Sequence, residues 1–363
     1  MSTQAPMTTV ETVAEDRRTA ARRGRRVHPT VAYVGRRVAL YLVSLWGALS
    51  ASFIFFRLIP GNPMQAIIGQ LQAKGQYSDP GQSAALVDHY QKSFGLDGSL
   101  LQQYWRYTQQ VILHQDFGPA ILSYPTPATH IVMRGLPWTM GLIGSATLLG
   151  WVVGLAGGTF VGWARGTRAA SWLTNFSLLI SHVPAFFIAL GLVYVFAYRR
   201  PLLPANSAYD ARLTPGWHLD FIMSVIKHGA LPVIATALVG AANWLIGTRA
   251  LVVSILGEDY LTYAAAKGLG PRRILASYVM RNAWLPQIAA LGIVMGSVIN
   301  GNVLIERLFR YPGLGNLLVD AIEVKDVNTA QAIVALLIFL VLTLNLIIDL
   351  ALPLLDPRVK RGQ

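Results

Sequence analysis

The stretch TMGLIGSATLLGWVVGLAGGTFVGW, residues 139–163, argues against a soluble fold because it contains no Lys, Arg, Asp or Glu. A helix needs about 20 consecutive apolar residues to cross the hydrocarbon core of a bilayer. Helices of soluble proteins average about 11 to 12 residues and keep a polar face. Further runs without a charged residue that reach membrane-spanning length are residues 38–56, 169–198, 229–248, 284–305 and 330–348. The pattern predicts an all-α integral membrane protein with about six transmembrane helices.

The composition of the chain supports a membrane protein. Of its 363 residues, 53% are hydrophobic and 13% are charged, against about 25% charged residues in an ordinary soluble domain. A net charge of +13 would point to nucleic acid in a soluble chain, but here the basic residues lie mostly between apolar runs and indicate topology. We therefore expect the lipid bilayer, and no nucleic acid, as a partner. The absence of cysteine excludes disulfides, thiol catalysis and Cys-bound metals.

The charge pattern predicts the orientation. Eight arginines and no lysine lie in residues 1–37, so we expect residues 1–36 to form a disordered basic tail in the cytoplasm. An even number of spans returns the C-terminal tail, residues 354–363, to the same side. A cleaved signal peptide is the alternative for residues 1–56, but the apolar run continues past the small-residue site at Ala48–Ser50, which favours an uncleaved anchor.

The remaining organisation follows from the positions of the runs. We expect a first transmembrane helix at 37–58, an extracytoplasmic segment at 59–137, and a five-helix core at 138–353 with a cytoplasmic loop at 257–283. The outer segment contains a stretch with helical character from Ser83 to Leu113 and is either a docking surface for an external partner or a cap without a role in transport. The second run carries a stripe of small residues, which predicts close packing within the subunit or a seam with another permease: Gly150, Gly154, Gly158 and Gly162.

The sequence contains no motif for nucleotide hydrolysis or metal catalysis. The one Lys-Ser pair, Lys92–Ser93, follows glutamine instead of the glycine of a phosphate-binding loop, and no histidine is followed by glutamate. We therefore expect no catalytic residue and no metal site. Polar residues inside the runs are candidates for a translocation path, with interhelical hydrogen bonding as the alternative role: Asn175, His182, Asn243, Asn300 and Asn302.

Residues 257–283 predict a bent helical elbow outside the membrane. The segment opens with Glu258 and Asp259, which suit a helix N-terminus, continues through an alanine-rich turn, and stops at Gly268 and Gly270–Pro271. A second amphipathic piece, residues 272–283, leads into the fifth run. Such an elbow fits a groove on a soluble partner.

The sequence resembles the permease subunits of ABC importers for dipeptides, oligopeptides and nickel, some relatives of which import oligosaccharides. The resemblance covers residues 36–358 and rests on the order of several short motifs: RLIPGNP at 57–63, FGLD at 94–97, DFG at 116–118, DYLTYAAAKGL at 259–269, RNAWLP at 281–286, ERLFRYPGLG at 306–315 and LDPR at 355–358. It implies a type I permease fold in which the elbow is the cytoplasmic coupling helix that enters a cleft of the ATPase. Thr262 replaces the glutamate of the general importer pattern and Tyr263 its first alanine, which we interpret as the identity of the dipeptide branch.

The resemblance also implies the machine and its working residues. The ATPase-coupling loop would comprise Asp259, Tyr263, Ala264, Ala265, Lys267, Gly268 and Arg272. The partners would be a second homologous permease, two cytoplasmic ATPase subunits that bind ATP and Mg, and an extracytoplasmic solute-binding protein, in the inner membrane of a bacterial cell. Oligopeptides or dipeptides are the expected solutes, with oligosaccharides as the alternative. The other hypotheses are a stand-alone secondary transporter or channel and a scaffold without transport.

Overall fold

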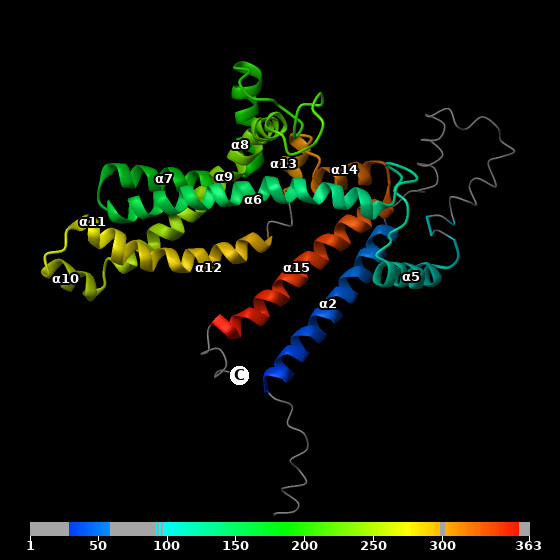
Figure 1. The fold of residues 1–363 in the computed structure, drawn as a ribbon, viewed down its shortest axis with the longest axis horizontal. Coiled ribbons are helices and arrows are strands. Elements are labelled where there is room, and N and C mark those ends of the chain that lie inside the picture. The colour runs from blue at the N-terminus through cyan, green and yellow to red at the C-terminus, as the bar shows by residue number, and fades with distance from the viewer. Residues whose placement is uncertain (1–28, 59–91, 93, 96, 298–301, 356–363) are drawn as a thin grey trace, which may run out of the picture. The chain divides into compact units, whose positions relative to one another are not determined.

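The computed structural model describes residues 29–58, 92, 94–95, 97–297 and 302–355, and these residues are helical and connected by loops (Figure 1). The α-helices are α2 (Pro29–Leu58), α5 (Leu100–Gln109), α6 (Ala128–Trp163), α7 (Arg168–His182), α8 (Ala185–Val193), α9 (Leu219–Ile255), α10 (Asp259–Ala266), α11 (Pro271–Ile274), α12 (Arg281–Ser297), α13 (Val303–Leu308), α14 (Leu314–Glu323) and α15 (Val327–Leu355). Short π-helices are η1 (Gln110–His114), η2 (Tyr194–Arg199) and η3 (Leu275–Met280). The β-pairing found in this part of the chain is one isolated bridge, Pro119 with Pro127. The predicted all-α class is confirmed.

Four helices in the described residues are long and apolar enough to cross a membrane: Tyr33–Leu58, Ala128–Trp163, Leu219–Ile255 and Val327–Leu350. A fifth span results if the bent pair α7 and α8–η2 is counted as one. The remaining predicted run, residues 284–305, contains α12 and then residues 298–301, which lie outside the described residues. The apolar helices therefore agree with a polytopic membrane protein, and the expected number of about six remains a prediction.

The third predicted run is bent and not one straight helix. The axes of Arg168–His182 and Ala185–Arg199 differ by 100°. Pro184 is the N-cap residue of α8 and has no backbone N–H. Val183 before it is extended, at φ −83° and ψ 122°, because the proline ring disfavours helical backbone in the preceding residue. The interruption that the sequence shows at His182 and Pro184 is thus a sharp bend.

Helices α6 and α9 form the main pair of the unit that comprises residues 47–341. The glycine stripe of α6 faces α9 so closely that a Cβ on Gly154 would lie 2.6 Å from the carbonyl oxygen of Ala241, and a Cβ on Gly158 would lie 2.6 Å from that of Leu245. No side chain fits there, and the two backbones meet directly. This stripe packs inside the subunit, which resolves the two alternatives in favour of internal packing.

Residues 1–46 and 342–363 form a separate unit, whose described parts are the first portion of α2 and the last portion of α15. Arg37 pairs with the carboxylate of Asp349 at 2.8 Å, and the hydroxyl of Tyr33 donates to the Asp349 carbonyl oxygen at 3.0 Å. Tyr41 and Thr343 share a hydrogen bond of 3.0 Å. These contacts hold the two helices together within this unit.

The outer segment between α2 and α6 has a shorter helix than the sequence predicted. Gly95 and Gly98 have positive φ, and α5 begins only at Leu100, after the capping box of Ser99. The predicted helical character is therefore wrong for residues 94–95 and 97–99, which are not helical, because two glycines adopt left-handed backbone there. Residues 59–91 lie outside the described residues.

Candidate functional site

The elbow after α9 is built as two short helices joined by a glycine. Helix α10 ends in a Schellman motif: the amide of Gly268 donates to the Ala265 carbonyl at 2.9 Å and that of Leu269 to the Ala264 carbonyl at 3.3 Å. Gly268 has φ +79°, a conformation that favours glycine. Gly270 then precedes Pro271, which occupies the first position of α11. The predicted stop signals thus produce the predicted bend.

One side of the elbow is fixed by apolar packing. Leu261 and Ala264 of α10 are buried against Val252 near the end of α9 and against Ile274 of α11, and Trp163 at the end of α6 packs on the same cluster. The indole N–H of Trp284 also donates to the hydroxyl of Thr159 on α6 at 3.1 Å. The elbow is therefore attached to the ends of both helices of the main pair.

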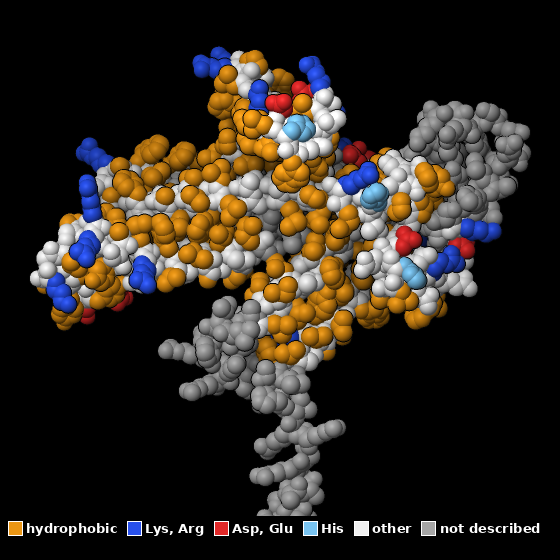
Figure 2. Space-filling view, viewed as in Figure 1, with side chains coloured by type: hydrophobic (Ala, Val, Ile, Leu, Met, Phe, Trp, Pro, Cys, Tyr) orange, Lys and Arg blue, Asp and Glu red, His pale blue; other side chains and the backbone are white. Residues whose placement is uncertain are grey.

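The other side of the elbow is exposed and polar. Tyr263 is 70% exposed and Tyr260 is 37% exposed. Of the residues predicted for the coupling loop, all are exposed except Ala264: Asp259, Tyr263, Ala265, Lys267, Gly268 and Arg272. Figure 2 shows Lys and Arg side chains gathered at this end of the molecule, over α10 and α11. The exposed surface therefore combines aromatic, basic and acidic side chains, while Ala264 faces inward and packs in the buried cluster.

The predicted path residues are spread over several elements, and His182 and Asn243 bond within their own helices. Asn175 on α7 and His182 at its end are exposed, and Nδ1 of His182 lies 2.7 Å from the Leu178 carbonyl oxygen. Asn243 is exposed on α9 and donates to the Val239 carbonyl at 3.0 Å.

Asn302 has a different role from these three. Its side chain accepts from the Ile305 amide at 3.4 Å and caps α13, whereas Asn300 lies outside the described residues. Within the part of the chain that is described, the structure does not bring these side chains into one site.

Sequence reasoning missed a buried carboxylate at the start of α14. Glu306 is fully buried, and its two oxygens accept from the hydroxyl of Thr139 at 2.9 Å and from the amides of Gly315 and Asn316 at 2.7 and 3.3 Å. The Thr139 oxygen in turn accepts from the Leu314 amide at 2.8 Å. The carboxyl oxygens thus satisfy open N-terminal amides of α14, which have no partner within the helix.

The glycines of the same motif make room for this carboxylate. A Cβ on Gly313 would lie 2.6 Å from both the Glu306 carboxyl carbon and the Thr139 hydroxyl, and a Cβ on Gly315 would lie 3.0 Å from a Glu306 oxygen. Loss of hydration in the interior raises the pKa of Glu306 above its ordinary range, against the opposing effect of its hydrogen bonds. The motif at 306–315, used only to find the resemblance, is therefore one structural unit.

A second buried acid, Asp326, holds the outer loop before α6. Its carboxylate accepts from the Leu122 amide at 3.0 Å and from the amide and hydroxyl of Thr329 at 3.1 and 2.7 Å. The side chain of Asn328 donates to the Pro119 carbonyl at 3.0 Å. Burial again raises the pKa of Asp326. The first turn of α15 is thereby attached to residues 119–122.

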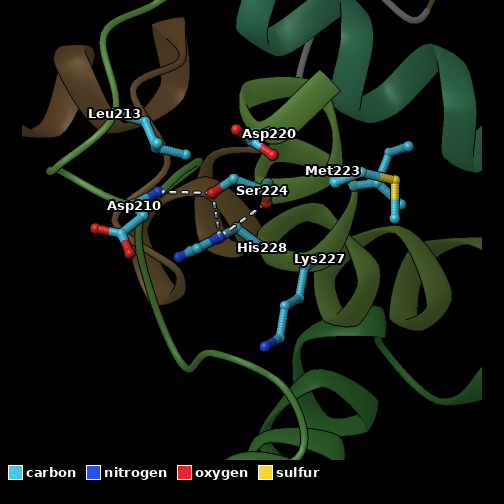
Figure 3. A pocket seen from close by; sticks show the side chains of 8 residues that line it. Asp210, Leu213, Asp220, Met223, Ser224, Lys227 and His228 are labelled. Atoms are coloured by element: carbon cyan, nitrogen blue, oxygen red, sulfur yellow. Dashed lines mark hydrogen bonds between the residues drawn. The ribbon is translucent and has the colours of Figure 1, made fainter. Parts of the chain in front are cut away.

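An open hollow of about 410 Å³ lies between the 200–218 loop and the start of α9, lined by Asp210, Leu213, Asp220, Met223, Ser224, Ile226, Lys227 and His228 (Figure 3). The Ser224 hydroxyl accepts from the Asp210 amide at 2.9 Å, which attaches the loop to the helix. Asp220 and Lys227 are exposed. No group of three or more His, Cys, Asp or Glu suited to a metal ion exists among the described residues.

Membrane-length apolar helices and a polar elbow fixed to the ends of two of them define a polytopic membrane protein of the permease class. The chain belongs to the family of binding-protein-dependent transport system inner membrane components, whose profile matches residues 154–361. The family is one of transport proteins and not of enzymes, and it resides in the inner membrane. The resemblance drawn from the short motifs is confirmed.

Several relatives extend the similarity over most of the chain. The di/tripeptide transport system permease protein DppB of Pseudomonas aeruginosa is 28% identical over 91% of this chain and 99% of its own length. A probable peptide ABC transporter permease protein, y4tP of Sinorhizobium fredii, is 30% identical over 85% of this chain and 92% of its own. The oligopeptide transport system permease protein AppB of Bacillus subtilis is 28% identical over 91% and 99%.

Proposed function

We propose that this chain is the permease subunit of an ATP-driven importer of oligopeptides or dipeptides, and that it forms half of the translocation path. The observation that carries the proposal is the elbow, whose exposed face of Tyr263, Lys267 and Arg272 is offered to a partner while its buried face is attached to α6 and α9. The relatives named for di/tripeptide, peptide and oligopeptide transport support the solute class.

The proposed machine contains a second homologous permease, two cytoplasmic ATPase subunits and an extracytoplasmic solute-binding protein. ATP and Mg bind to the ATPase subunits, and this chain needs no cofactor of its own. Both termini and the elbow lie in the cytoplasm. Closure of the ATPases on ATP draws the elbows together and rocks the helix bundles between outward and inward access.

Purification of the tagged chain from its native membrane in mild detergent tests the composition of the machine. We expect mass spectrometry to find a second permease and ATPases, and the eluate to hydrolyse ATP faster when the correct binding protein and its peptide are added. A chain that purifies alone and still conducts solute in liposomes would instead support a secondary transporter or channel.

Cross-linking tests the elbow directly, because the chain has no cysteine of its own. With Tyr263→Cys, a short bifunctional thiol reagent should join this chain to an ATPase subunit that carries a cysteine in its cleft. Trp172→Cys is the matched control, since Trp172 is 67% exposed on α7, outside the elbow. Equal cross-linking at both positions would contradict the assignment.

A further inference from the structure

The pair α6 and α9 is built as a stiff connection between the two sides of the membrane. A Cβ on Gly150 would lie 3.0 Å from the Ala237 carbonyl, and one on Gly162 would lie 2.6 Å from the side chain of Val252. The two backbones are therefore in contact from Gly150 to Gly158, and the Val252 side chain fills the contact at Gly162. The helices have no room to slide without a clash. The pair moves as one body, which we name the α6–α9 strut.

The inner end of the strut carries the elbow. Val252 of α9 and Trp163 of α6 both belong to the cluster that buries Leu261 and Ala264 of α10. Any displacement that an ATPase imposes on α10 is thus passed to the strut through packed side chains.

The outer end of the strut carries the hairpin formed by α13 and α14. Thr139 lies on α6, 24 residues before Trp163, which corresponds to about 36 Å of helix. Its hydroxyl bridges the Glu306 carboxylate of α13 and the Leu314 amide of α14. The hairpin in turn holds the neighbouring outer loop, because the Ser207 amide donates to the Phe309 carbonyl at 2.8 Å.

We propose that Thr139 and Glu306 are positioning residues that fasten the α13–α14 hairpin to the α6–α9 strut, so that movement of the elbow is carried to the outer face. The proposal rests on the proposed function, which places the elbow inside and the hairpin outside. Phe309, Tyr311 and Leu314 also pack into apolar clusters with the helices beneath them. We therefore expect the hairpin to stay folded when the polar link is removed, so that loss of the link affects the transmission of movement.

The test uses the complete importer in liposomes with its binding protein and a peptide substrate. Thr139→Val keeps the shape of the side chain and removes the hydroxyl, so the Leu314 amide and one Glu306 oxygen lose their partner. We expect ATP hydrolysis to continue while peptide uptake per ATP hydrolysed falls by about 2- to 30-fold, the usual range for loss of a coupling contact. Thr139→Ser retains the hydroxyl and is the matched control, with uptake per ATP close to that of the wild type.

A second measurement follows the hairpin itself. Arg310 is exposed at its turn, and Arg310→Cys introduces a single thiol into a chain without cysteine. Its labelling rate by a membrane-impermeant maleimide should change when ATP and vanadate trap the closed ATPases, and Thr139→Val should abolish this change.

The outcomes separate the two proposals. An unchanged labelling rate in the chain that carries only Arg310→Cys would overturn the inference even if Thr139→Val failed to assemble. Equal uptake per ATP in Thr139→Val and Thr139→Ser would also overturn it. A wild-type complex without any ATP-dependent uptake would instead refute the proposed function.

Discussion

Replacing Gly154 with alanine is expected to weaken the pairing of α6 and α9 by about 1–3 kcal/mol, the usual cost of overpacking a close contact. The new Cβ would lie 2.6 Å from the Ala241 carbonyl oxygen and 3.0 Å from the Leu245 amide nitrogen, whereas unstrained contacts between non-bonded carbons are about 3.5–4.0 Å long. Both neighbours are backbone atoms of α9, so no side-chain rotation relieves the clash. The helices must separate locally by roughly 1 Å, which also opens the contacts on either side.

The control is Gly141→Ala in the same helix, where a Cβ would meet nothing within 4 Å. Alanine favours helix over glycine by up to about 1 kcal/mol, so this variant should be neutral or slightly more stable. The assay is unfolding of the purified chain by SDS in mixed micelles, followed by circular dichroism. A loss of 1–3 kcal/mol corresponds to a change of about 5- to 150-fold in the folding equilibrium. Equal unfolding of the two variants would show that α6 and α9 are not held backbone to backbone at Gly154.

Further predictions concern the elbow and the two buried acids. Gly268→Arg should abolish uptake and leave membrane insertion intact. Gly268→Asn should retain more transport, because asparagine tolerates φ +79° and adds no charge. Normal uptake by the arginine variant would refute the coupling role. Burial raises the pKa of Glu306 above its ordinary value of 4.5, so the folded chain holds a proton at a pH where the unfolded chain has released it. The stability of the wild type relative to Glu306→Gln should therefore be greatest below pH 4.5. It should decrease as the pH rises through the pKa of the folded state. Melting curves of both proteins across pH check this sign, and a difference that increased with pH would contradict it. Asp326→Asn replaces the carboxylate that accepts from the Leu122 amide. The free energy of unfolding should fall by about 1–3 kcal/mol in the same SDS titration, and protease cleavage should appear near Leu122. Unaltered stability would show that this bond is dispensable.

Local sequence signals predicted much of the fold, because a membrane-spanning helix requires a long uncharged run that is easy to recognise in a sequence. Uncharged runs of membrane-spanning length have few alternatives to a helix. Within the run 169–198, Pro184 lies at the 100° bend. The elbow was also readable, since Gly268 and Gly270–Pro271 act on the backbone within a few residues. Helix limits in the outer segment were harder to predict. The residues between Ser83 and Leu113 have helical character, but Gly95 and Gly98 have positive φ and α5 begins only at Leu100.

The intramembrane polar residues show that residue type alone does not predict function. Asn243 and His182 were candidates for a path because polar groups in a span are costly. The structure shows that a carbonyl four residues earlier satisfies each of them, a local bond that any helix offers. A polar residue in a span thus indicates function only when its partner comes from another element.

Thr139 and Glu306 meet that criterion, but neither residue by itself pointed to this contact in the sequence. They are 167 positions apart, Thr139 is a common residue in an apolar run, and Glu306 is followed by Arg307, which suggests an exposed ion pair. Arg307 does pair outward with Asp320 and Glu323, whereas Glu306 turns inward because α14 presents unpaired amides there. The clue was the spacing of Gly313 and Gly315 after the acid. In this chain a Cβ at either glycine would lie within 3.0 Å of a Glu306 oxygen, so the two glycines are required for the carboxylate to reach the first amides of α14.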